Sequence, residues 1–108
     1  MANYLFISSR DPYESPDSES FIKLVESIQA RHHSTTVFLV QNGVLSARSG
    51  ARHSEIIQRL ARAGVTVIAD RFSLRERAVG KLADGVAVAD IDRLVDLMIE
   101  PDTKTIWQ

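Results

Sequence analysis

Asp70 is the carboxylate of this chain best suited to ligand binding or proton transfer. It follows residues 65–69 (VTVIA), a short β-branched run that predicts a strand buried on both faces. Ser73 and Glu76 stand three places apart, a capping-box spacing that predicts a helix beginning at Ser73. Ligands in open parallel sheets bind outside the carboxyl ends of the strands, so we expect any site to lie near Asp70 and Arg71.

Polar residues after two other predicted strands would lie at the same edge of the sheet. The resulting ligand-binding rim consists of Ser8, Asp11, Asn42, Gly43, Asp70, Arg71 and Ser73. In a functional interpretation, the rim binds an anion or a small metabolite, and Asp70 handles a proton. In a structural interpretation, Asp70 pairs with Arg71 or Arg75 or caps the helix. Asn42-Gly43 would then be only a tight turn, and both interpretations remain open.

Several kinds of catalytic chemistry lack the residues they need. The chain has no cysteine, which excludes disulfides, thiolate metal sites, cysteine nucleophiles and persulfide carriage. It contains neither a glycine-rich phosphate-binding fingerprint nor a nucleophile elbow. His32 and His33 are adjacent and so point in different directions on a helix, and no carboxylate or thiol is arranged with them or with His53. We therefore predict no catalytic residue, no metal site and no cofactor.

Charge and hydropathy limit the partners. The 13 basic and 14 acidic side chains give a net charge of −1, which provides no bulk attraction to nucleic acid or anionic lipid. A basic cluster in mid-chain lacks interleaved aromatics and is more typical of a solvated or subunit-facing surface; it comprises Arg48, Arg52, Arg59 and Arg62. No apolar run approaches the roughly 20 residues of a membrane span, and the first residues lack a signal-peptide pattern. We expect a cytoplasmic protein that binds neither nucleic acid nor membrane.

Strand-like and helix-like segments alternate along the chain. Strands are predicted at residues 3–9, 35–41, 65–69, 86–89 and, as an edge strand, 103–107. Helices are predicted from a Ser15 cap to about His32, over 52–63, from Ser73, and from an Asp90 cap to Pro101, with one further helical turn within 44–50. The side chains expected to face the core are Phe21, Leu24, Val25 and Ile28, then Ile56, Ile57, Leu60 and Ala61, then Ile91, Leu94, Val95 and Met98.

This alternation predicts a single-domain, three-layer α/β/α fold over residues 1–108, with a mostly parallel sheet of about five strands. A domain of 108 residues can bury a hydrophobic core of ordinary size. Its exposed sheet edges are hard to cover within one chain, which makes oligomers plausible. Trp107 lies in the predicted edge strand. We expect it to pack on the core or, as the favoured alternative, to be buried between subunits.

Four stretches together resemble the DsrE/DsrF/DsrH-like family, the sulfur-relay group that includes TusB, TusC and TusD. They are residues 4–9 (YLFISS), 37–44 (VFLVQNGV), 65–77 (VTVIADRFSLRER) and 85–95 (GVAVADIDRLV). The family often shows an apolar strand ending in an Asn/Asp-Gly-Val turn and a Ser/Ala-Leu-x-x-Arg-Gly corner after the third strand. The order and spacing of these motifs carry the resemblance, which covers nearly the whole chain.

The resemblance implies a single DsrE-like domain with a flavodoxin-like layout. It also implies homo-oligomers, commonly trimers or hexamers, or hetero-oligomers with related DsrE-like subunits. In active members, a cysteine near the end of the third strand or elsewhere on the rim carries sulfur as a persulfide; the corresponding position here is Asp70 or its neighbour. A second departure is Ala78, which follows Arg77 where the family has glycine.

Two functions are consistent with these observations. The first is a non-catalytic, cysteine-less DsrE-like oligomer associated with intracellular sulfur metabolism or sulfur relay. The alternative is a small-molecule-binding or anion-binding protein, or an enzyme, that uses the polar rim around Asp70. A buried, unpaired Asp70 beside a pocket would favour the alternative, whereas an ordinary salt bridge on an open surface would oppose it.

Overall fold

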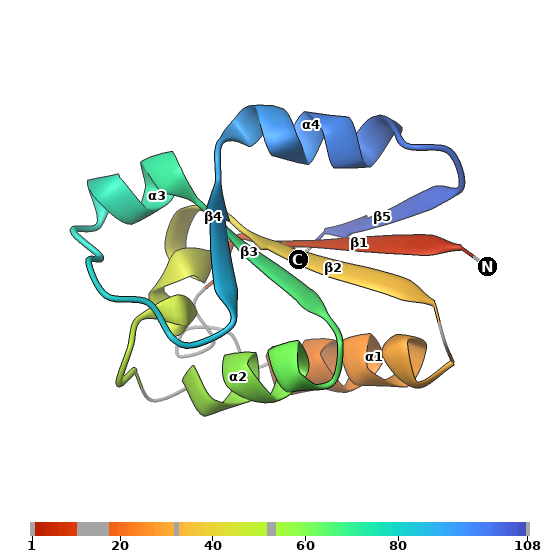
Figure 1. The fold of residues 1–108 in the computed structure, drawn as a ribbon, viewed down its shortest axis with the longest axis horizontal. Coiled ribbons are helices and arrows are strands. Elements are labelled where there is room, and N and C mark those ends of the chain that lie inside the picture. The colour runs from red at the N-terminus through yellow and green to blue at the C-terminus, as the bar shows by residue number, and fades with distance from the viewer. Residues whose placement is uncertain (1, 11–17, 32, 52–53, 108) are drawn as a thin grey trace.

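Five strands alternate with helices along the chain (Figure 1). The structure is a computed structural model, and it describes residues 2–10, 18–31, 33–51 and 54–107. In chain order the elements are β1 (Asn3–Ser8), α1 (Ser18–Ala30), β2 (Ser34–Leu39), the 3-10 helix η1 (Gln41–Ala47), α2 (Ser54–Arg62), β3 (Thr66–Asp70), α3 (Arg71–Glu76), β4 (Val86–Ala89), α4 (Ile91–Ile99) and β5 (Thr103–Trp107). The predicted alternation of strands and helices is therefore confirmed.

The five strands form one sheet in the order β4-β3-β2-β1-β5, and every neighbouring pair is parallel. The apolar runs of β1, β2 and β3 occupy the three inner positions, which is why these strands are the most buried. β5 lies at one edge, as predicted, and β4 at the other. Because all strands are parallel, their carboxyl ends meet at one end of the sheet.

The two faces of the sheet are covered unequally. Helices α1 and α2 lie on one face, and α4 lies on the other (Figure 1). Alternate residues of a strand point to opposite faces, so the strands contribute to two separate cores. The larger core, under α1 and α2, includes Phe6, Val37, Val67, Val25 and Leu60. The smaller core, under α4, consists of Leu5, Ile7, Phe38, Ile68 and Leu94.

The helix after β3 begins two residues earlier than predicted. α3 starts at Arg71, and its N-cap is Asp70, whose Oδ2 accepts a hydrogen bond from the Ser73 backbone N–H at 3.0 Å. The prediction of a Ser73 cap was wrong, because the Ser73 hydroxyl donates to the same carboxylate oxygen at 2.7 Å. An aspartate at this position accepts the N3 amide as well as a serine would, so the capping-box spacing did not identify the cap.

Two predicted apolar stripes are also corrected. In α1, Leu24 is exposed, and Ile22 contributes to the core instead. In α4, Leu94 is buried against the sheet with Leu97 partly buried beside it, whereas the other three residues of the predicted stripe, Ile91, Val95 and Met98, are exposed. A short amphipathic helix with apolar residues on more than one side does not indicate by itself which side faces the sheet.

Element ends mostly agree with the predictions. α1 ends at Ala30, and its predicted start at Ser15 lies outside the described residues. The turn predicted within 44–50 is part of η1. Asp90 is the N-cap residue of α4, but its carboxylate makes no capping hydrogen bond; it pairs with Arg71 at 2.7 Å.

Candidate site at the carboxyl ends of the strands

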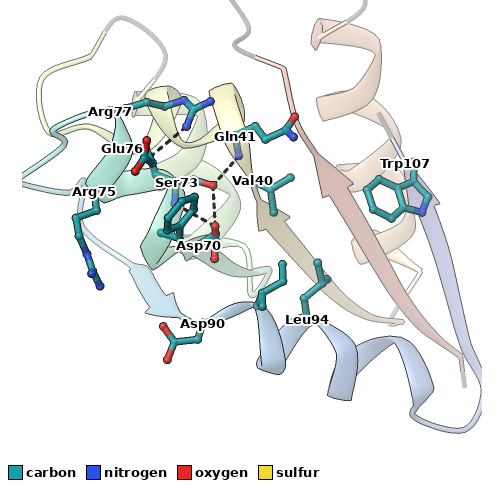
Figure 2. Close-up of a pocket in the computed structure, with 12 residues that line it drawn as sticks. Val40, Gln41, Asp70, Ser73, Arg75, Glu76, Arg77, Asp90, Leu94 and Trp107 are labelled. Atoms are coloured by element: carbon teal, nitrogen blue, oxygen red, sulfur yellow. Dashed lines mark hydrogen bonds between the residues drawn. The ribbon is translucent and has the colours of Figure 1, made fainter.

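Asp70 is buried at the carboxyl end of β3, with 5% of its surface exposed. It is two residues after Ile68, so its side chain lies on the face that α4 covers. Its Oδ2 accepts both Ser73 hydrogen bonds, and the Ser73 Oγ in turn accepts the backbone N–H of Gln41 at 2.8 Å (Figure 2). Oδ1 is buried and has no hydrogen-bond partner among the described residues. Oδ2 therefore stabilises the β3–α3 corner, whereas Oδ1 accepts no hydrogen bond from the described residues.

No cation among the described residues pairs with Asp70. Arg71, one of its two expected partners beside Arg75, instead forms an ion pair with Asp90 at the β4–α4 junction. Arg77 donates from Nε to Asn42 Oδ1 at 2.9 Å and from Nη1 to the Ser73 carbonyl at 3.4 Å. Asp70 therefore caps α3, as the structural interpretation predicts, but it does not form the predicted ion pair with an arginine of the described chain.

A hollow of about 920 Å³ lies beside Asp70 at the carboxyl end of the sheet (Figure 2). Its lining consists of Val40, Gln41, Asp70, Phe72, Ser73, Arg75, Glu76, Arg77, Asp90, Ile91, Leu94 and Trp107. α3 and the start of α4 provide half of these residues, and β5 provides Trp107 at the far side. A single helix covers this face of the sheet, which leaves room for the hollow.

The structure brings together only part of the predicted rim. Asp70 and Ser73 line the hollow. Gly43 packs instead against the backbone of Ser8, where a β-carbon would overlap the Ser8 carbonyl oxygen, and Ser8 itself is buried. Asn42 and Arg71 are engaged by the side chains described above and do not line the hollow. Asp11 lies outside the described residues.

Several lining residues were missed by the sequence reasoning. Val40 and Gln41 follow directly on β2, and the signal that could have found them is the same carboxyl-end rule that identified Asp70. Phe72 and Ile91 lie beside helix starts, where the rule also applies. Trp107 ends the predicted edge strand, so the carboxyl-end rule applies to it as well, although its place beside β1 depends on the strand order.

The other candidate groups do not converge. His33 makes an edge contact with the Tyr4 ring, and His32 and His53 lie outside the described residues. In the described part of the chain, no three histidine or acidic residues are arranged to hold a metal ion. Arg59 pairs with Glu26 at 2.9 Å, and Arg48 donates to the Leu45 carbonyl.

Across the same described residues, none of the helices has the length and apolar character that spanning a membrane requires.

The fold and the site together define the class of protein: a single parallel sheet lies between helices, and a hollow of about 920 Å³ lies at the carboxyl ends of its strands. The chain belongs to the DsrE/DsrF-like family, because the model of that family matches residues 2–105. The resemblance seen in the sequence motifs is thereby confirmed.

Two solved structures share the fold over the full length of both chains. The ychN protein from E. coli is similar with a TM-score of 0.90 at 16% sequence identity. MTH1491 from Methanobacterium thermoautotrophicum, a protein of unknown function, is similar with a TM-score of 0.82 at 21% identity. No curated protein matches the chain. At these identities, the likeness establishes the fold alone.

Proposed function

We propose that this chain is a non-catalytic DsrE-like subunit that assembles with further copies of itself in the cytoplasm and serves sulfur metabolism or sulfur relay. Membership of the DsrE/DsrF-like family supports the link to sulfur chemistry. The chain has no cysteine, and the thiolate is the group that accepts sulfane sulfur, so this subunit does not carry the sulfur itself.

The observation that carries the assembly is an apolar surface, here called the α4 band. It consists of Ile91, Val95, Met98 and Ile99 on α4, together with Trp107 on β5, and all five side chains are exposed. The four helical positions follow the i, i+4, i+7, i+8 spacing of one helix face. Leu94 and Leu97 occupy the side of α4 that packs on the sheet, so the exposed residues lie off that side, and Ile91 among them also borders the hollow.

An exposed apolar helix face of this kind is unusual on a monomer and typical of a subunit contact. The five members of the α4 band are among the eight large apolar side chains that are exposed in the described chain, so the exposed hydrophobic surface is concentrated there. The free edge of β5 lies beside the band and would be covered by the same contact. We propose a homotrimer or homohexamer.

Native mass spectrometry of the gently purified protein at low salt tests this proposal. We expect a trimer or hexamer for the natural sequence. Val95→Asp should dissociate it, because the α4 band would have to bury a charge at a position that is 50% exposed in the single chain. Leu24→Asp is the matched control: Leu24 is 45% exposed on α1, at the opposite face of the sheet, and its substitution should leave the assembly intact.

A monomer of the natural sequence at micromolar concentration would contradict the proposed self-assembly. A complex that forms only with a cysteine-bearing DsrE-like subunit would replace the homo-oligomer with a hetero-oligomer. Dissociation by both substitutions alike would show that the α4 band is not the contact.

A second candidate function is the binding of a small molecule at the hollow. The specific observation in its favour is the buried Asp70 Oδ1, which no group in the described part of the chain hydrogen-bonds and which belongs to a residue that lines the hollow. The same mass spectra test it: a reproducible extra mass on the natural protein should disappear in Asp70→Ala. An extra mass that persists in this variant would place the ligand elsewhere.

A further inference from the structure

Asp70 Oδ1 is a buried hydrogen-bond acceptor to which no described residue donates. The neighbouring Oδ2 already receives two hydrogen bonds from Ser73, and no described side chain or backbone group donates to Oδ1. Most buried carboxylate oxygens are hydrogen-bonded, and an exception calls for an explanation. An ionised carboxylate can only accept, so the missing partner is a donor.

The walls of the hollow indicate what kind of molecule would bring that donor. Apolar and aromatic side chains form much of the lining, namely Val40, Phe72, Ile91, Leu94 and Trp107. Small-molecule sites typically combine such walls with a few polar groups that set the orientation. Phe72 is the most exposed of these side chains and lies outside the α4 band, which leaves its ring available to an incoming planar group.

An anion does not suit this site. It would have to approach a carboxylate whose charge no described cation neutralises. Of the two arginines in the lining, Arg77 is already held by Asn42 and Ser73. Arg75 alone would remain for the anion, and it is exposed to solvent.

A bare metal ion does not suit the site either. Metal ions that bind oxygen need several ligands. Asp70 presents one free oxygen, and no metal-binding group of three acidic or histidine residues exists among the described residues.

We propose that the hollow binds a planar organic cation or a heterocycle with paired N–H donors, whose donor group hydrogen-bonds to Asp70 Oδ1 while its apolar body lies between α3 and α4. This proposal rests on the second candidate function and specifies its ligand class. The hydrogen bond is charge-assisted, which makes it stronger than a neutral one. Oδ1 is almost completely covered in the unliganded chain, so the lining side chains must shift slightly when the donor enters.

Benzamidinium is the probe, since it joins a planar apolar ring to paired N–H donors. Benzoate is its matched counterpart, with the same ring but only acceptors. Each is titrated into ¹⁵N-labelled protein and followed by NMR at the Ser73 and Gln41 amides and at the indole N–H of Trp107, the single tryptophan of the chain. We expect saturable shifts with benzamidinium, with a dissociation constant on the order of 1 mM for a molecule of this size, and no shifts with benzoate.

Asp70→Asn is the decisive variant, because it separates the cap from the ligand contact. The asparagine oxygen can still accept from Ser73, whereas its amide group puts a donor where Oδ1 was. We expect benzamidinium affinity to fall at least tenfold, while the urea midpoint of unfolding stays close to that of the natural protein. Asp84→Asn removes the same charge at an exposed residue outside the hollow and should bind the probe normally.

The outcomes distinguish the ligand class from the ligand-binding function. Binding of benzoate instead of benzamidinium at the same three signals would overturn the ligand class and leave the function standing. No shift with either probe would overturn both. Benzamidinium binding that survives Asp70→Asn would also overturn the proposal, since the donor would then not be held by Oδ1.

Discussion

Ala78 shows how a single residue can carry backbone strain. Its φ of 52° lies in the left-handed region, and the DsrE-like motif has a glycine at this place after Arg77. A left-handed conformation costs an L-residue about 1–2 kcal/mol, and glycine adopts it freely. The Ala78 side chain is exposed, so it offers no packing that would compensate. The departure from the family motif therefore lowers the stability of the α3 C-terminus without changing the fold.

We predict that Ala78→Gly raises the free energy of unfolding by about 0.5–1 kcal/mol, because relief of the strain exceeds the entropy that glycine adds to the unfolded chain. Urea denaturation at equal protomer concentration measures the change. Ala30→Gly is the control: Ala30 is exposed, ends α1 and is free of left-handed strain, so this change should instead lower the free energy of unfolding, by at most about 0.5–1 kcal/mol at the end of a helix. A loss of stability in both variants would refute the strain argument.

At the scale of elements, the turn after β2 is held by a close backbone approach. Gly43 N–H donates to the Val40 carbonyl at 2.9 Å, and Val40 N–H donates to the Ser8 carbonyl at 2.9 Å. A β-carbon on Gly43 would meet that same Ser8 oxygen. Gly43 is therefore needed so that η1 can pack against the end of β1, and this requirement explains the Asn-Gly-Val motif without reference to a ligand.

We expect Gly43→Ala to lower the free energy of unfolding by about 2–3 kcal/mol, since rigid backbone would have to move. Gly80→Ala is the matched control, because a β-carbon there meets nothing within 4 Å and the φ of Gly80 is not left-handed. Thermal or urea unfolding of the two variants measures the difference in their free energies of unfolding. Equal stabilities would mean that the β1–η1 contact is looser than described.

At the scale of the whole molecule, the unequal covering of the two sheet faces determines where function can lie. Two helices close one face, and α4 alone covers the other. The hollow beside Asp70 and the α4 band both follow from this asymmetry, and Ile91 and Trp107 belong to both. Assembly through the band would therefore alter the wall of the hollow, which links the two proposed functions physically.

Trp107 provides a direct readout of assembly. It is 63% exposed in the single chain, so its fluorescence should resemble that of a tryptophan in water when the protein is monomeric. We expect emission at shorter wavelength in the assembled protein and a shift to longer wavelength on dilution or in Val95→Asp, because the subunit contact removes water from the indole. An emission maximum that is independent of concentration, in a protein that native mass spectrometry shows to dissociate, would place Trp107 outside the contact.

The strands and helices and their order follow from local patterns in the sequence. Apolar, β-branched runs such as residues 65–69 predict the buried strands, and the carboxyl-end rule indicates Asp70 as the centre of a site. Local signals also placed the last helix and strand correctly, since Asp90, Pro101 and the intervening apolar residues act over a few positions. These features depend on conformational preferences that are set by residues close together in the sequence.

Which side chains come into contact depends on the tertiary structure. The pairing of Arg71 with Asp90, the burial of Asp70 without a cation and the approach of Trp107 to the hollow depend on strand order. The orientation of α4 depends on which of its apolar sides packs on Ile7 and Phe38 of the sheet. Such contacts join residues far apart in the chain, and their energies depend on packing and burial that no local pattern contains.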